Sequence, residues 1–447
     1  MRELGDQVHL DAESLHRCAW DYGRMVQRTP AVVVSVRSSE ELQAALRIGS
    51  EHALPIVTRG SGHCMSGQGL AEGALVIDMK GLCGVQIDAE RRSGWLSGGA
   101  TWHQVTNAAF THGLMPVGLT TIVDTTVGGT LSVGGVGGES FRTGAQVDQV
   151  LELDVATIDG KITRCSGAQN KELFDAVRAG VGQCGVIVAA RYPLRQAKAQ
   201  LRSYTLACPD GRALVADMQT ISRDARVDFM FGAMIWNAQR GWQVLLLLGK
   251  EHDDPSELND SALLSGLHSQ LELVRADSPQ WQLDGRPGHP FIRLFEEPTS
   301  HCDDEDALHR PWVDHLCEPQ AAAELISTVM SGPMVAARAR TSGVVLGIAP
   351  HPKRAPLLQP HTHGPLILLG LSPEASDAQL QDALAYVRRH NEHGAAIGGK
   401  RYMSGFMEGW TESEWSSHFG KAWPWFRAMR NRVDPQGLLN NAHIRWH

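Results

Sequence analysis

The pattern of hydrophobic and polar positions predicts a strand–helix–strand unit near the start of the chain. Residues 31–36 are apolar and mostly β-branched, as expected for a buried strand. Residues 38–41 (Ser-Ser-Glu-Glu) place a hydroxyl three positions before a glutamate, which is typical of a helix N-terminus, and apolar residues then recur at helical spacing. A second apolar run at 54–57 predicts a strand that leads directly into a glycine-rich loop at 58–69.

Similar patterns predict the other elements. Strands are expected at 74–79, 84–88, 94–98, 150–157, 161–165, 186–192, 228–235 and 243–248, the last two as neighbours in a second sheet. Helices are expected from Thr101 to Gly113, from Asn170 onward, and at 256–276, 319–330, 377–392 and the first part of 412–447, where Asp434-Pro435 ends the helix. The proline-rich stretch 350–365 is expected to be a loop. Aromatic residues at helical spacing in the last helical segment indicate a buried face.

Four glycines surround a single histidine, His63, in the loop at 58–69. Glycine lacks a Cβ atom and tolerates positive φ, so such a loop brings its backbone close to a ligand. Backbone N–H groups in a turn of this kind can point together at a phosphate. The loop is therefore predicted to bind phosphate, while the histidine needs a separate explanation.

A second glycine-rich tract spans residues 127–140. Glycine at this density is not expected inside an ordinary helix or strand. A flexible linker is the alternative, but well-patterned elements flank the tract and apolar residues interrupt it. We therefore expect backbone packed tightly under a flat ligand. Glu139 and Arg142, at the end of the tract, are expected to form structural hydrogen bonds.

Residues 180–185 match the pattern GxGxxG, which in isolation suggests a nicotinamide-dinucleotide site. That site requires a strand before the motif and a helix after it. The predicted order is the reverse, with a helix before and the strand 186–192 after. We therefore reject a dinucleotide site at this position.

Composition restricts the class of protein. The 447 residues are 43% hydrophobic and 20% charged, which is normal for a globular protein of two or three domains. The formal net charge of −8 gives no electrostatic case for nucleic acid, and no apolar run reaches the ~18–20 residues that span a membrane. The polar N-terminus lacks a signal-peptide pattern, and eight scattered cysteines without CxxC suggest a reducing cytoplasm. No metal site is expected, since no HExxH occurs and the closest pair, His361 and His363, lies in a loop.

Four blocks of sequence resemble the flavoprotein superfamily of vanillyl-alcohol oxidase and p-cresol methylhydroxylase (PCMH), and cytokinin dehydrogenase most of all. The first block, Arg59-Gly60-Ser61-Gly62-His63-Cys64 with Gln68, is similar to RGxGHS…GQ, whose histidine bonds covalently to FAD in that family. The others follow in the family's order, at 127–155, 172–187 and 399–439, and Arg310-Pro311-Trp312 resembles part of the family's substrate domain.

The resemblance implies an α+β fold with a two-part PCMH-type FAD-binding domain and an inserted substrate domain built on an antiparallel sheet with helices. The expected limits are 1–198 for the FAD-binding domain, 199–398 for the substrate-binding cap domain and 399–447 for a segment that returns to the FAD-binding domain. The implied cofactor is FAD, covalent through His63. The implied cofactor contacts are Arg59, Gly60, Ser61, Gly62, His63, Cys64, Gln68, Thr121, Thr126, Gly129, Ser132, Val136, Ile187, Tyr402, Asn440 and His443.

The sequence departs from the family at two places. Thr121 stands where cytokinin dehydrogenases carry the aspartate that accepts a hydrogen bond from the substrate amine, which argues against cytokinin as the substrate. The nearest carboxylate, Asp124, stands where the berberine-bridge branch has a second, cysteine attachment, so attachment through His63 alone is expected. Residues 440–443 (Asn-Asn-Ala-His) replace the family's Ser-Pro-Gly-Gln.

The resemblance implies oxidation of a small-molecule electron donor. The flavin takes a hydride from a C–H bond next to nitrogen or oxygen of a small amine or alcohol, and dioxygen or a quinone-like molecule accepts the electrons. Asp124 and Tyr402 are the candidate proton acceptors, against structural roles as a turn cap and a core aromatic. Two alternatives remain, a sugar or polyol oxidase and a catalytically silent flavin-binding protein. The sequence indicates no oligomeric state.

Overall fold

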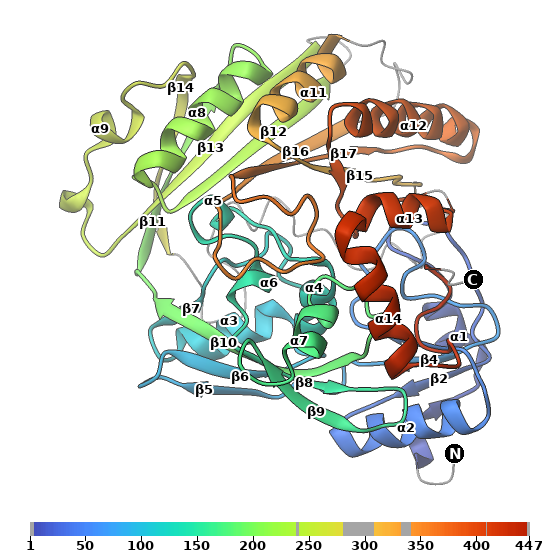
Figure 1. The fold of residues 1–447 in the computed structure, drawn as a ribbon. Helices are drawn as coiled ribbons and strands as arrows, with labels where there is room; N and C mark the ends of the chain where they lie inside the picture. The colour runs from blue at the N-terminus through green and yellow to red at the C-terminus, as the bar shows by residue number, and fades with distance from the viewer. Residues whose placement is uncertain (1–3, 238–240, 280–307, 332–340, 408, 445–447) are drawn as a thin grey trace.

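Three β-sheets organise the chain (Figure 1). The computed structural model describes residues 4–237, 241–279, 308–331, 341–407 and 409–444. Sheets of four and six strands lie in the N-terminal half, and an eight-stranded sheet holds the middle of the chain. Helices combined with mainly antiparallel sheets confirm the predicted α+β class. None of the described helices is long and apolar enough to cross a membrane.

The four-stranded sheet carries the glycine-rich loop. Its strands pair in the order β1 (Val8–His9), β2 (Val32–Ser35), β4 (Leu75–Asp78) and β3 (Ile56–Arg59), after the short helices η1 (Gly5–Gln7) and α1 (Ala12–Arg17). Helix α2 (Ser39–Glu51) connects β2 to β3, and the Ser38 side chain accepts the Glu41 N–H at 3.2 Å, as the predicted cap requires. Strands β2, β4 and β3 are parallel, so β3 delivers the loop at its carboxyl end.

The six-stranded sheet lies beneath a layer of short helices (Figure 1). Its strands are β5 (Val85–Asp88), β6 (Ser93–Ser97), β7 (Leu114–Pro116), β8 (Glu152–Ala156), β9 (Ile162–Ser166) and β10 (Val186–Gln196). The helices are α3 (Trp102–Phe110), α4 (Val127–Val133), α5 (Ser140–Thr143), α6 (Gln146–Gln149) and α7 (Lys171–Val177). Helix α7 precedes the GxGxxG turn and β10 follows it, which confirms the reversed order predicted for that motif.

One prediction for this region was wrong, because the glycine-rich tract begins with a helix, α4. Glycine disfavours helix interiors, but packing overrides that preference here. A Cβ atom at Gly128 would lie 3.0 Å from the Gly98 carbonyl oxygen, so the glycine lets the helix approach the end of β6 closely. The Thr126 side chain caps the helix by accepting the Gly129 N–H at 3.3 Å.

The eight-stranded sheet is antiparallel throughout. Its strands pair in the order β14 (Gln270–Pro279), β11 (Gln200–Ala207), β13 (Gly241–His252), β12 (Phe229–Asn237), β16 (Thr341–Ile348), β17 (Leu366–Pro373), β15 (Val313–Cys317) and β18 (Lys400–Arg401). Helices α8 (Gly211–Asp224), α11 (Pro319–Ser331) and α12 (Leu380–Ala396), the last preceded by η4 (Asp377–Gln379), cover its outer face (Figure 1). The predicted pairing of 228–235 with 243–248 is confirmed.

The predicted helix at 256–276 was wrong. The segment forms the short helices η2 (Pro255–Glu257) and α9 (Asp260–Leu264) and then strand β14. Gly266, at φ +70°, ends the helical part, and residues 270–273 then pair with β11 as an edge strand. Long-range pairing therefore overrides the local helical pattern.

The C-terminal segment returns to the first sheet. It contains α13 (Glu412–Phe419), η5 (Gly420–Ala422) and α14 (Trp423–Val433). The aromatic residues at helical spacing are buried, as predicted: Trp415, Phe419, Trp423 and Phe426. Beyond α14, the Asp434 carboxylate accepts the N–H groups of Leu438 and Leu439. The Asn440 N–H then donates to the Ile56 carbonyl at 2.7 Å, beside the start of the glycine-rich loop.

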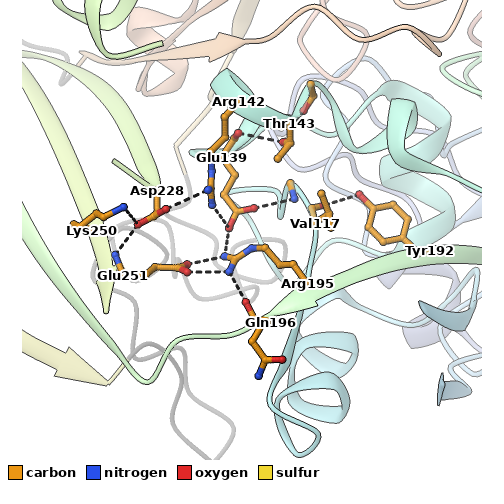
Figure 2. A network of polar contacts seen from close by, with 12 residues as sticks. Val117, Glu139, Arg142, Thr143, Tyr192, Arg195, Gln196, Asp228, Lys250 and Glu251 are labelled. Atoms are coloured by element: carbon orange, nitrogen blue, oxygen red, sulfur yellow. Dashed lines mark hydrogen bonds and ion pairs between the residues drawn. The ribbon is translucent and has the colours of Figure 1, made fainter. Parts of the chain in front are cut away.

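A buried charge network joins the six-stranded and eight-stranded sheets (Figure 2). Arg195 at the end of β10 donates to both Glu139 and Glu251. Arg142 and Lys250 approach Asp228 at 3.1 and 3.0 Å. Three cations thus balance three carboxylates in the junction, and Glu139 and Arg142 have the structural role expected of them.

The domain limits 199 and 398 remain predictions. Strand β18 lies after the second limit but still belongs to the eight-stranded sheet.

Candidate functional site

The first half of the glycine-rich loop presents backbone N–H groups that suit an anion. Among the described residues, the N–H groups of Gly60, Ser61 and Gly62 make no backbone hydrogen bond, whereas the Gly67 N–H donates to Asp21 at 3.2 Å. A Cβ atom at Gly60 would lie 2.1 Å from Oγ1 of Thr126, so only glycine fits against the cap of α4. This backbone is compatible with the predicted phosphate site.

His63 packs against an aromatic ring, and its charge acts on the carboxylate of Asp124. The Tyr22 ring stacks on the imidazole, with ring centroids 4.7 Å apart and an interplanar angle of 18°. The Asp124 carboxylate lies 3.6 Å from Nδ1 of His103, on α3. The contact with His103, and to a smaller extent the charge of His63, hold the pKa of Asp124 below its usual range. Asp124 is therefore ionised at neutral pH, and its backbone carbonyl also accepts the Ser61 hydroxyl.

The second half of the loop is bonded to the segment 403–407, which follows β18. The Met65 N–H donates to the Ser404 carbonyl at 3.0 Å. Gln68 accepts the Ser66 N–H and donates to the Met403 carbonyl, both at 2.8 Å. Gln68, one of the predicted cofactor contacts, therefore stabilises the loop through these hydrogen bonds.

The Arg59 side chain packs against the glycine-rich loop. Its guanidinium donates to the Trp20 carbonyl at 3.0 Å and would lie 2.4 Å from a Cβ atom at Gly62. The Arg59 Cγ atom is the nearest atom to the position that a Cβ atom at Gly69 would take, at 3.7 Å. Only 9% of Arg59 is exposed. Cys64, next to His63, accepts the Tyr22 N–H through its carbonyl at 3.2 Å, and burial raises the pKa of its thiol to about 12.

Tyr402 joins the second glycine-rich tract to the loop region. Its hydroxyl accepts the Gly135 N–H at 2.7 Å, and its ring packs where a Cβ atom at Gly134 would lie. Burial raises the pKa of the phenol, so the group is neutral and retains its own proton to donate. Packing of the Tyr402 ring in the core is therefore compatible with a role of its hydroxyl as a proton or hydrogen-bond donor.

The structure adds Asp314, a residue that the sequence patterns did not indicate. It lies on β15, is 2% exposed, and accepts hydrogen bonds from the Trp312 indole and, at 3.4 Å, from Ser404. Burial raises the pKa of its carboxyl group to about 7, and the Tyr402 N–H donates to its backbone carbonyl at 3.2 Å. A carboxyl group with a pKa near neutrality thus belongs to the residue that is bonded to the Tyr402 backbone. Only its place two residues after Trp312 could have suggested it.

Two predicted contact residues carry buried polar atoms without a protein partner among the described residues, Oγ1 of Thr121 and Nε2 of His443. Burial lowers the pKa of His443 to about 3, so its ring is neutral. Buried polar atoms are nearly always hydrogen-bonded in native proteins. These two orphaned atoms, with the unbonded loop amides, fit a polar cofactor such as FAD.

Asn440 ties the C-terminal segment to the site. With φ at +49°, its side chain accepts the Thr58 N–H at 3.0 Å and donates to the Gly182 carbonyl at 2.8 Å. A Cβ atom at Gly182 would lie 2.7 Å from that side chain. The GxGxxG turn therefore serves backbone packing against Asn440.

The other predicted contact residues lie on α4, on the second glycine-rich tract and on β10. The Ser132 hydroxyl donates to the Gly128 carbonyl at 2.7 Å, and the Val136 carbonyl accepts the Thr120 hydroxyl at 3.3 Å. Ile187 is buried on β10, and its carbonyl lies where a Cβ atom at Gly98 would be. Within the described chain, no three His, Cys, Asp or Glu side chains come together as a metal site.

Comparison with known proteins identifies relatives along the whole chain. Residues 30–166 match the family described as FAD binding domain. The uncharacterized oxidoreductase ORF5 in the fasciation locus of Rhodococcoides fascians is 31% identical over 438 residues, which cover 96% of this chain and 97% of that protein. Cytokinin dehydrogenase 1 of Arabidopsis thaliana is 26% identical over 479 residues, which cover 96% of this chain and 81% of that protein. The solved structure of xylooligosaccharide oxidase from Myceliophthora thermophila, in complex with xylobiose, shares the fold, with a TM-score of 0.75 at 18% identity over 98% of this chain and 96% of that one.

Proposed function

Because the chain belongs to the FAD-linked oxidoreductases of the vanillyl-alcohol oxidase and PCMH superfamily, we propose that it oxidises a small amine or alcohol with FAD bonded covalently to His63. The observation that carries the proposal is the loop itself, in which the amides at 60–62, which make no backbone hydrogen bond, precede a histidine stacked on Tyr22. The amides bind the pyrophosphate, and the histidine tethers the ring.

When bound, FAD accepts a hydride from a C–H bond next to nitrogen or oxygen. The residues around it orient the donor and handle its proton. Tyr402 keeps its proton and can donate a hydrogen bond to the donor's heteroatom, while Asp314 behind it titrates near neutral pH. Asp124, ionised, is the other candidate to accept a proton.

Electrons then pass to dioxygen or to a quinone-like acceptor. No nucleic acid or membrane partner is proposed. A reducing compartment such as the cytoplasm is the proposed location, which the free thiols of the described cysteines support.

A sugar or polyol donor is the second candidate. The similarity to xylooligosaccharide oxidase over nearly the whole chain supports it, although at 18% identity that similarity concerns the fold. Thr121 in place of the family aspartate separates the chain from cytokinin dehydrogenases at the position that binds the substrate amine.

An anaerobic donor panel tests the function. Amines, alcohols and sugars are added to the flavin-loaded protein, and loss of the oxidised flavin absorbance band is followed for each. Bleaching by one class identifies the donor class. No bleaching by any donor would contradict the proposal and favour a catalytically silent flavin-binding protein.

The attachment is tested separately with His63→Ala. The wild-type chain is expected to keep its flavin after acid precipitation, whereas the variant is expected to release all of it. The measurement is flavin fluorescence of the denatured chain. Fluorescence that stays with the denatured variant would rule out His63 as the attachment point.

A further inference from the structure

A segment near the N-terminus, residues 18–28, lies against the glycine-rich loop at His63. Within it, the Tyr22 ring is parallel to the imidazole to within 18°, at a centroid separation of 4.7 Å. The backbone of Tyr22 is also bonded to the loop, because its N–H donates to the carbonyl of Cys64, the residue after the histidine. Tyr22 therefore contacts the histidine and its neighbour in two independent ways.

Tyr22 is itself held from both sides. On one side, the buried Asp21 carboxylate accepts the Gly67 N–H of the loop at 3.2 Å and the Met25 N–H at 2.8 Å. On the other side, the Gly23 carbonyl accepts the Arg310 N–H at 2.9 Å, and a Cβ atom at Gly23 would lie 2.6 Å from the Arg310 carbonyl oxygen. The tyrosine backbone thus belongs to a turn that is bonded both to the loop and to Arg310, three residues before β15.

We propose that Tyr22 is a positioning residue that fixes the plane of the His63 imidazole and so sets the rate at which His63 bonds to the flavin. The proposal rests on the covalent attachment proposed above. An imidazole nitrogen reacts through a lone pair in the plane of its ring, so rotation of the ring turns that lone pair away from the reacting carbon. An imidazole packed flat against the Tyr22 face loses that contact when it tilts, so the observed stacking favours the present ring plane.

The attachment balances with dioxygen as oxidant. His63 forms one N–C bond to a methyl carbon of the flavin ring. One hydrogen leaves that carbon and one leaves the imidazole N–H. The two protons and two electrons reduce one dioxygen to hydrogen peroxide. Tyr22 takes no part in the bonds that form or break.

The test compares Tyr22→Phe, which keeps the aromatic face, with Tyr22→Met and Tyr22→Leu, which remove it at similar volume. Each full-length chain is prepared without flavin and mixed with FAD in air. The covalent fraction is followed by the mass of the denatured chain, and total bound FAD is followed by absorbance of the folded protein. Tyr386→Leu on α12, which removes a buried tyrosine elsewhere, is the matched control.

Tyr22→Phe and Tyr386→Leu are expected to attach FAD at the wild-type rate. Tyr22→Met and Tyr22→Leu are expected to bind FAD but to attach it roughly tenfold more slowly or worse, the scale of loss for a misaligned reacting group. Attachment at the wild-type rate in both aliphatic variants would overturn the proposal. So would loss of all FAD binding in both, because Tyr22 would then hold the loop and not the ring plane. If the wild-type chain itself attaches no flavin, the covalent attachment fails together with this inference.

Discussion

Gly60 is the position where the loop has least room. Because Gly60 has no side chain, there is space for the Thr126 hydroxyl, which caps α4. The loop therefore contacts the first residue of that helix cap. Gly69, in the same loop, faces ordinary van der Waals space, with the nearest atom 3.7 Å from a Cβ position. The two glycines therefore allow a comparison in which only one is required sterically.

Gly60→Ala is expected to weaken FAD binding at least tenfold. The new methyl group would overlap the Thr126 hydroxyl, and overpacking of this kind typically costs about 1–3 kcal/mol. Gly69→Ala is expected to bind FAD as the wild type does. Titration of the flavin-free chains with FAD, followed by flavin fluorescence, measures both, and equal affinities would show that the loop adapts to the methyl group.

At the scale of the residue, chemistry close in sequence was predictable and chemistry brought together by folding was not. The glycines and histidine of the loop are neighbours in the chain, so their pattern predicts a phosphate site, and the family resemblance of the same residues adds the flavin. Asp314 gains its environment from Trp312 and Ser404, and the latter is far away in sequence. Tyr22 meets His63 only because an early turn folds back over the loop.

Elements are stabilised here by packing as much as by local preference. Helix α4 forms despite its glycines because they let it pack on β6, and β14 forms in a stretch with a helical pattern because β11 offers an edge. Neither outcome is encoded within a short window of sequence. By contrast, α2 and α3 were predictable, since their caps lie in adjacent residues.

The junction of the two larger sheets gives an element-scale prediction. Arg195→Ala is expected to destabilise the fold by about 3–5 kcal/mol, because it removes the cation shared by the buried carboxylates Glu139 and Glu251, and Arg142 approaches only Glu139, at 3.8 Å (Figure 2). Burial already raises the pKa of Glu251. Denaturant unfolding, followed by tryptophan fluorescence, gives the change in free energy.

Arg191→Ala is the control on the same strand. Arg191 pairs with Glu152 near the surface, with 31% and 28% of the two side chains exposed, so about 0–1 kcal/mol is expected. Similar losses in the two variants would mean that the network in Figure 2 contributes no more than a surface pair.

Across the whole molecule, buried ionisable groups act on stability in opposite directions. Burial lowers the pKa values of His390 and His418 to about 3, so acid favours the unfolded chain, where histidine protonates near 6.5. Burial raises the pKa of Asp148 to about 6 and that of Asp314 to about 7. These carboxyls bind protons more tightly when folded, so they favour the folded chain as the pH falls through that range.

His390→Leu isolates one of these terms. The unfolded wild type gains the proton as the pH falls below 6.5, while folded His390 stays neutral until about 3. At pH 5 the variant is therefore expected to gain about 2 kcal/mol on the wild type relative to pH 7.5, since each pH unit is worth ~1.36 kcal/mol.

Unfolding free energies of both chains at the two pH values provide the test, and the carboxyl groups cancel in the difference. His112→Leu, at an exposed position after α3, serves as the control. A difference between wild type and His390→Leu that stays constant from pH 7.5 to 5 would contradict the assignment.

The hydrogen bonds of Asn440 have a consequence for biosynthesis. Asn440 accepts the Thr58 N–H across 382 residues of sequence. At ~5–20 residues per second, the ribosome adds Asn440 roughly 20–75 s after Thr58. During that interval the nascent loop lacks this partner and its partners at 403–407. The loop is thus synthesised early, and its full set of hydrogen-bond partners exists only when the chain is nearly complete.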